Sequence, residues 1–157
     1  MSTQTQKSLA DLVDRVEITK LMLTFVGSLD RRDWAGYAQT FTEDGVFEIM
    51  GQRRIGHAEI AAGPERDLGG FARTQHFSTN HTIELAGDSA TATHDLLAVH
   101  VPDAGRPDEH ADIGGLYRCQ CTRTAEGWRF EHVALEICWT AGQQFGLQPP
   151  DSDTGAN

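Results

Sequence analysis

The stretch TQHFSTNHTIELAGD, residues 74 to 88, decides how this chain folds. Read with a period of two, it places polar side chains on one face of a strand and apolar side chains on the other. The polar face carries His76, Ser78, Asn80 and Thr82. The apolar face carries Phe77, Ile83 and Leu85. This alternation is typical of a strand with one buried side. It leaves open whether the polar face is an outer surface or the lining of a pocket.

The second half of the chain predicts further strands with the same alternation, joined by short turns rich in Gly, Asp and Ser. The expected antiparallel meander spans residues 76–85, 90–101, 113–123 and 127–139. In the last strand the apolar positions change parity between Phe130 and Val133, which predicts a β-bulge that re-curves the sheet.

The first half of the chain is predominantly helical. Apolar residues recur at spacings of three and four between Leu9 and Leu29, with Ser8 placed to cap the helix start. A second short helix is predicted from Asp33, as N-cap, to Phe41. A short strand at 46–50 follows, and then one or two helical turns in residues 57–71, broken at Gly63-Pro64.

Helices followed by a long antiparallel sheet predict an α+β domain in which the sheet wraps the amphipathic first helix. The open end of such a curved sheet is where small molecules bind, so we expect a hydrophobic pocket there. We assign the domain to residues 8–142, between an N-terminal arm, 1–7, and a flexible C-terminal tail, 143–157.

Composition excludes several classes of protein. The chain has 157 residues, 39% of them hydrophobic, and a formal net charge of −10, which opposes binding to nucleic acid or to an anionic membrane. No apolar run approaches the ~20 residues of a membrane span and no signal peptide is evident, so we expect a cytoplasmic protein. The three cysteines are expected to be reduced thiols, and their spacing supplies no metal site.

Two residues stand out as possible acid–base groups. Asp30 lies at the end of the first helix, where the dipole disfavours a negative charge. Its partner is either Arg31 or Arg32 beside it, the turn itself, or a histidine that it orients from inside the fold. His76, which opens the polar face of its strand, is the candidate. Motifs of nucleophile elbows, P-loops and dinucleotide-binding turns are absent from the sequence.

Histidines of the next strand add a second candidate. His94 and His100 share one face with small apolar residues. They are separated by about 20 Å of strand, so at most one of them belongs to a pocket that also contains His76.

Three segments together resemble the SnoaL-like branch of the nuclear transport factor 2-like superfamily: FVGSLDRRDWAGYAQTFTEDG, TQHFSTNHTIEL with GDSATATHDLLAVHV, and GGLYRCQCTRTAEGWRFEHVALEICW. The similarity covers about residues 8–142. It implies a cone-like barrel, a curved antiparallel sheet wrapped around the N-terminal helix. The patterns most similar to this chain are those of scytalone dehydratase and hexachlorocyclohexane dehydrochlorinase.

The resemblance implies roles for individual residues. Asp30 in LDRRDW, His76 in TQHF and His100 in AVHV match the catalytic positions of the dehydratase pattern. Its two tyrosines correspond to Leu29 and Ile49 here, and its pocket asparagine to Tyr117. The dehydrochlorinase arginine corresponds to Glu136. Further wall residues are expected to be Trp34, Asn80 and Trp139.

These residues suggest a lyase that needs no cofactor and no metal and acts on a small, mostly apolar cyclic compound. A compound of the polyketide class is one such substrate. His76 oriented by Asp30 would remove a proton from carbon, and His100 or Tyr117 would assist the leaving group. A ketone isomerase or cyclase, an epoxide hydrolase, and a non-catalytic ligand-binding or oxygenase-subunit role remain alternatives. A homo-oligomer, trimer or dimer, is also expected.

Overall fold

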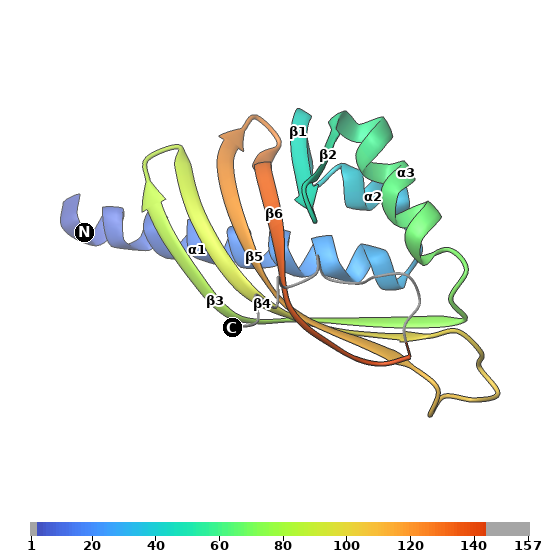
Figure 1. The fold of residues 1–157 in the computed structure, drawn as a ribbon. Helices are drawn as coiled ribbons and strands as arrows, with labels where there is room; N and C mark the ends of the chain where they lie inside the picture. Colours follow the sequence, from blue (N-terminus) through green and yellow to red (C-terminus); the bar gives the residue numbers. More distant parts are fainter. Residues whose placement is uncertain (1–2, 144–157) are drawn as a thin grey trace, which may run out of the picture.

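The computed structural model describes residues 3–143, which form three helices and six strands (Figure 1). In chain order they are α1 (Thr3–Asp30), α2 (Trp34–Ala38), β1 (Phe41–Ile49), β2 (Gln52–Ile55), α3 (Gly56–Leu68), β3 (Arg73–Ala86), β4 (Ser89–Val101), β5 (Ala111–Thr124) and β6 (Gly127–Gly142). The α+β class is therefore confirmed.

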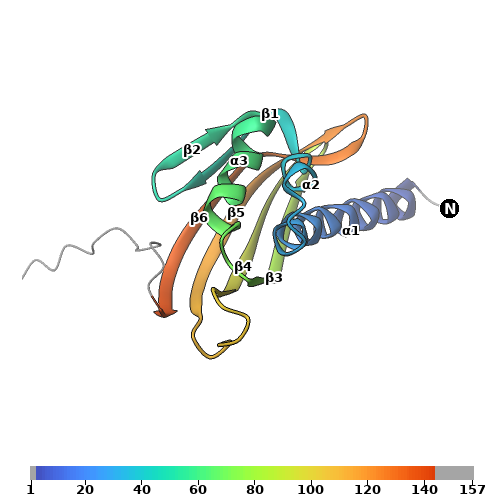
Figure 2. The same cartoon turned by 90° about the vertical axis from the view of Figure 1, so that its right-hand side faces the viewer.

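The six strands form one curved sheet in the order β2-β1-β6-β5-β4-β3. It bends around α1, while α2 and α3 lie on the same side near β1 (Figures 1 and 2). Two corrections to the expected barrel follow. β1 runs parallel to β6, so the sheet is mixed and not wholly antiparallel. The sheet is also unclosed, because its edge strands β2 and β3 do not pair with one another.

The core forms where α1 crosses the sheet. Residues at helical spacing, including Ile18, Met22 and Phe25, are fully buried, and the Phe25 ring contacts the rings of Tyr37 and Tyr117. The N-terminal part of α1 instead projects past β3 (Figures 1 and 2), and its apolar residues Leu9, Leu12, Val13 and Val16 are exposed. Despite the length of α1, no helix within residues 3–143 is apolar enough to cross a membrane.

Two bulges decide which side chains face the interior. In β3 the register with β4 shifts between Thr79 and Thr82, and Asn80 adopts a left-handed backbone with φ of +54°. The polar half of β3 before this bulge and the apolar half after it therefore both face inward. The bulge predicted in β6 is confirmed, since Cys121 pairs with Phe130 but Gln120 pairs with His132.

Several boundaries differ from the sequence predictions. α1 begins at Thr3, so Ser8 lies within the helix and is not its cap, and the predicted arm is helical from Thr3. Asp33 is the N-cap of α2 as expected. β2 was not predicted, and α3 continues through Pro64. The predicted flexible tail lies, from residue 144 onward, outside the described residues.

The outer face of the sheet carries an apolar row. Phe77, Leu97, Gly114 and Trp139 occupy paired positions on four neighbouring strands. The three large side chains are 41% to 49% exposed. Apolar groups in such a row are more common at interfaces than on free surfaces, but a homo-oligomer stays a prediction.

One buried carboxylate ties the exposed half of α1 to the sheet. Asp14 accepts hydrogen bonds from Arg123 Nη2 (2.7 Å) and from the indole nitrogen of Trp128 (3.2 Å). Arg123 also donates to Asp88 in the β3–β4 turn, and its guanidinium lies 4.6 Å from the centre of the Trp128 ring. A single cluster therefore joins α1 to both hairpins.

We expect Asp14→Ala to lower the free energy of unfolding by about 1–3 kcal/mol, because the buried Trp128 indole loses its acceptor and Arg123 keeps only an exposed partner. Urea unfolding measures the change. Glu17→Ala, an exposed position one turn further along α1, is the matched control. Equal stability of the two variants would contradict the role given to Asp14.

Candidate active site

The end of α1 is shaped so that Asp30 points toward β3. Arg32 takes a left-handed backbone with φ of +60°, and the amides of Arg32 and Asp33 donate to the carbonyls of Leu29 and Ser28. This is the hydrogen-bond pattern of a Schellman motif, with arginine where glycine is usual. The Arg32 guanidinium donates to the carbonyl oxygens of Leu68 and Phe71 at the end of α3 (2.7 and 2.8 Å). Arg32 is thus not the partner of Asp30.

Asp30 and His76 form a close pair. His76 Nδ1 lies 2.6 Å from Asp30 Oδ1, and the His76 backbone amide donates to Asp30 Oδ2 (2.9 Å). The Thr74 hydroxyl donates to Oδ1 as well (3.1 Å). The His76 side chain is 5% exposed and that of Asp30 is 25% exposed. The sharper of the two expectations for Asp30 is therefore the one that the geometry matches.

The charge state of Asp30 defines the tautomer of its partner. Burial raises the pKa of Asp30, but hydrogen bonds from the His76 ring, the His76 amide and Thr74 outweigh it and hold the pKa below its ordinary value. The carboxyl group is therefore ionised at neutral pH and can only accept. His76 Nδ1 must donate, which leaves Nε2 of the neutral ring with a free lone pair. That nitrogen is a candidate base.

His100 lies beside His76 with a different chemistry. The two ring centres are 5.5 Å apart and the rings are perpendicular. His100 is 2% exposed, and its Nδ1 lies 3.3 Å from the carbonyl oxygen of Ala111. Because a carbonyl only accepts, Nδ1 carries the proton and Nε2 is an acceptor. Burial and then the neighbouring His76 lower the pKa of His100 to about 4, so this ring is neutral at neutral pH.

Both histidines line one cavity of about 70 Å³ beneath α3. Most of its wall is apolar. Its lining residues come from all three helices and all six strands, and α1 contributes only Leu29, near its C-terminal end. The polar lining residues are Tyr37, Arg54, Asp67, His76, His100 and Tyr117. Asp30 lies behind His76. The arrangement combines a candidate base with a mostly apolar cavity, a combination that acid–base chemistry on carbon requires.

Two phenols in this cavity are available as hydrogen-bond donors. Tyr37 and Tyr117 are each 2% exposed, and their hydroxyls bond to no residue of the described chain. Within residues 3–143 the sole fully buried side-chain polar atom without a partner is Nε2 of His94, so both hydroxyls keep accessible surface. Burial raises the pKa of both phenols above the ordinary value, so both stay protonated. Sequence reasoning missed Tyr37, which was assigned only to a helix face.

The structure brings together five of the predicted site residues: Asp30, Ile49, His76, His100 and Tyr117. The four others lie outside the cavity lining, and that part of the prediction is corrected. The bulge in β3 turns Asn80 outward, where it donates to Asp95 (2.6 Å). Trp34 lies against the Arg32 guanidinium (5.6 Å).

The remaining two residues lie on the outer face of β6. Glu136 is exposed and pairs with Arg118 (3.5 Å). Trp139 is 49% exposed, and its indole occupies the space that a side chain at Gly114 would need, since an added Cβ would lie 2.0 Å from Trp139 Cε2. Neither residue can contact a ligand beside His76.

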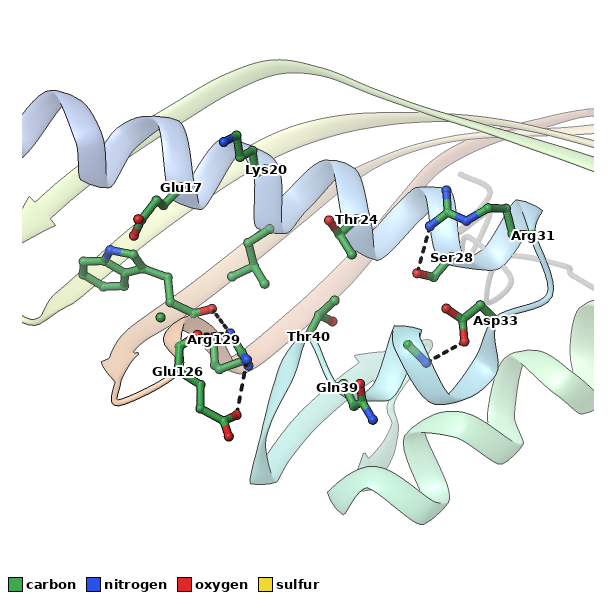
Figure 3. A pocket seen from close by; sticks show the side chains of 14 residues that line it. Glu17, Lys20, Thr24, Ser28, Arg31, Asp33, Gln39, Thr40, Glu126 and Arg129 are labelled. Carbon is green, nitrogen blue, oxygen red and sulfur yellow. Dashed lines mark hydrogen bonds and ion pairs between the residues drawn. The ribbon is translucent and has the colours of Figure 1, made fainter.

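A second, larger hollow of about 510 Å³ lies between α1, α2 and the β5–β6 turn (Figure 3). Charged and hydroxyl side chains line it, among them Lys20, Arg31 and Arg129, and no histidine or tyrosine does. We therefore place the candidate active site in the smaller cavity. Residues 3–143 also contain no group of three or more His, Cys, Asp or Glu side chains arranged to hold a metal ion.

A family profile described as the SnoaL-like domain matches residues 10–134, most of the chain. The chain belongs to the SnoaL-like domain family. The resemblance inferred from the sequence is thereby confirmed.

Solved structures support the same fold for this SnoaL-like domain. A provisionally assigned scytalone dehydratase of Novosphingobium aromaticivorans is 20% identical, with a TM-score of 0.80 over 96% of this chain and 99% of the other. An NTF2-like protein of cystatin-like fold from the same organism is 25% identical, with a TM-score of 0.78 over 88% and 90%. The hexachlorocyclohexane dehydrochlorinase LinA type 2 is 18% identical, with a TM-score of 0.77 over 92% and 99%. Such low identities establish the fold alone.

The SnoaL-like domain also buries a second histidine cluster on β3 and β4. His94 is fully buried, with Nδ1 2.7 Å from the Ser78 hydroxyl, which lies 2.7 Å from His81 Nε2. His94 stacks on Tyr117 with ring centres 4.6 Å apart. Burial and then His81 lower the pKa of His94 to about 4. The prediction that at most one of His94 and His100 shares a pocket with His76 is confirmed, because His100 lines the cavity and His94, which pairs with Tyr117 across the strands, does not.

Two buried neutral histidines make stability depend on pH. Each folded-state pKa of about 4 lies below the ordinary value of 6.5, so the stabilisation is full above pH 6.5 and is lost as the pH falls toward 4. We expect a loss on the order of 3 kcal/mol per histidine in urea unfolding across this range. The lowered pKa of Asp30 acts at more acidic pH.

His94→Gln tests this assignment, because it should flatten the dependence of unfolding free energy on pH between 6.5 and 4. His132→Gln, at a partly exposed position, should leave that dependence as it is in the natural protein. A pH dependence that is the same in all three proteins would exclude His94 as its source.

Proposed function

We propose that this protein is a cofactor-independent lyase, a dehydratase or related elimination enzyme, that acts on a small, mostly apolar cyclic compound. The observation that carries the proposal is the 2.6 Å contact that holds His76 against an ionised Asp30 at the wall of an apolar cavity. The resemblance to dehydratase and dehydrochlorinase patterns supports the same reaction class.

His76 can serve both halves of an elimination. Its Nε2 accepts a proton from the carbon next to an activating group, and the released electron pair forms the carbon–carbon double bond. The carbon–oxygen bond on the neighbouring carbon breaks, and the departing hydroxide takes that same proton from the imidazolium and leaves as water. Asp30 stabilises the imidazolium between the two transfers, and the ring returns to its neutral tautomer.

The other polar groups then divide between two tasks. Tyr37 and Tyr117, as protonated phenols, donate hydrogen bonds to oxygen atoms on which negative charge develops. We assign the assistance to the leaving group to Tyr117. His100 is neutral, and its free nitrogen accepts a hydrogen bond, so it orients a hydroxyl group and does not supply a proton.

The volume of the cavity favours a second candidate, a non-catalytic ligand-binding module. A cavity of about 70 Å³ is far below the ~300–1,000 Å³ of typical ligand pockets, so a ring enters only if the wall moves. Pro64, Asp67 and Leu68 of α3 line the cavity, and of these three Asp67 is exposed to solvent. A binding module would admit the ring in the same way but would not transfer protons.

Proton abstraction separates the two candidates. The protein is assayed on cyclic β-hydroxy ketones such as 3-hydroxycyclohexanone, by the absorbance of the conjugated enone and by exchange of the proton next to the carbonyl in D₂O. We expect His76→Ala to lower both rates by roughly 10²–10⁴-fold and Asp30→Asn to lower them as well. His110→Ala is the control, since His110 pairs with Asp112 away from the cavity. Unchanged rates in both dyad variants, or no activity in the natural protein, would exclude the base.

A further inference from the structure

The cavity contains an ion pair that the proposed elimination does not use. Arg54 of β2 and Asp67 of α3 both line the cavity, and Arg54 Nη2 lies 2.5 Å from Asp67 Oδ2. The Arg54 side chain is 12% exposed, whereas that of Asp67 is 32% exposed and also meets Arg66 outside (3.1 Å). The pair therefore lies at the mouth of the cavity with the guanidinium on the inner side.

The packing around Arg54 is adapted to hold the guanidinium at this position. An added Cβ at Gly63 of α3 would lie 2.0 Å from Arg54 Nη1, so only glycine leaves room for the guanidinium against the helix. The guanidinium also lies 5.8 Å from the centre of the Phe47 ring. Asp67 is an exposed residue, and ion pairs at the surface contribute little net stability, because water screens their attraction. Stability therefore does not account for the pair.

Most hydrogen-bond donors of Arg54 are free. Within the described chain one of its three guanidinium nitrogens donates to a protein group, the Asp67 carboxylate. None of its nitrogens is both fully buried and without a partner, so the others retain accessible surface. Arg54 also acts on the nearby phenol: burial and then Tyr117 raise the pKa of Tyr37, and the positive charge of Arg54 opposes them. Arg54 and Tyr37 both line the cavity.

We propose that Arg54 binds an uncharged carbonyl oxygen of the ligand and that Asp67 makes this subsite reject carboxylates. A guanidinium with free donors is a strong partner for an oxygen acceptor. A ligand carboxylate on the same guanidinium would lie beside the Asp67 carboxylate and be repelled, whereas a ketone oxygen meets no such repulsion. The inference rests on the proposed function only in taking the cavity as a ligand site. Arg54 positions the ligand; it is not the base.

Binding of two probes of similar shape, acetophenone and benzoate, tests the subsite by protein-observed NMR titration. The natural protein is expected to prefer acetophenone. Arg54→Met should weaken acetophenone binding roughly ten- to a hundredfold. Asp67→Asn should strengthen benzoate binding and reverse or narrow the preference. Arg53→Met and Glu65→Gln, at exposed neighbouring positions, are the matched controls.

Several results would overturn the subsite: no binding of either probe to the natural protein, equal acetophenone affinity in Arg54→Met and Arg53→Met, or an unchanged preference in Asp67→Asn. Arg54→Lys, which keeps the positive charge, replaces Arg54→Met as the test variant if Arg54→Met does not fold. It too should weaken acetophenone binding. The readout is separate from catalysis. Loss of turnover in His76→Ala with unaltered probe binding in Arg54→Met would overturn the subsite alone, and the opposite pair of results would overturn the base alone.

Discussion

The structure of the site depends on one hydrogen bond, between the last residue of α1 and the ring of His76 on the edge strand β3. It joins segments 46 residues apart, and it requires α1 to end at Asp30 and β3 to begin with its polar half facing inward. The left-handed Arg32 meets the first requirement, and the bulge at Asn80 meets the second. Both are backbone features that cost free energy, which the contacts around them must offset.

Charge and burial oppose each other around this contact, and their balance determines the chemistry. Burial raises the pKa of Asp30, but three donors outweigh it and hold that pKa below its ordinary value. Burial keeps His100 neutral and both tyrosines protonated. The cavity therefore presents one anchored imidazole, one neutral imidazole that accepts, and two phenols that donate. Groups that differ in protonation state thus line one mostly apolar cavity, which is what general acid–base catalysis needs.

Much of this fold follows from residue periodicity. The core stripe of α1, the four long strands and the β6 bulge were all evident in the sequence. α1, β4, β5 and β6 bury apolar residues at regular spacing, and β3 alternates between more and less exposed positions on either side of its bulge. β2 was missed because QRRI is short and polar. α3 was expected to break at Gly63-Pro64, yet the glycine there makes room for Arg54, a reason that lies in the tertiary structure. Parity failed at Asn80 for a similar reason, since nothing local marks the β3 bulge.

The candidate site, like the fold, could be predicted only in part from the sequence. Asp30, His76 and His100 could be named from the sequence because a resemblance marked them, whereas Tyr37 and the Arg54–Asp67 pair come together only when the helices and the sheet enclose one cavity.

The tautomer of His76 is the most direct test of the central claim, that Asp30 holds the His76 ring with Nδ1 protonated. In a long-range ¹H–¹⁵N NMR spectrum, the neutral ring of His76 should show a protonated Nδ1 and an unprotonated Nε2, and Asp30→Ala should abolish that preference. A ring protonated at Nε2 in the natural protein would contradict the account.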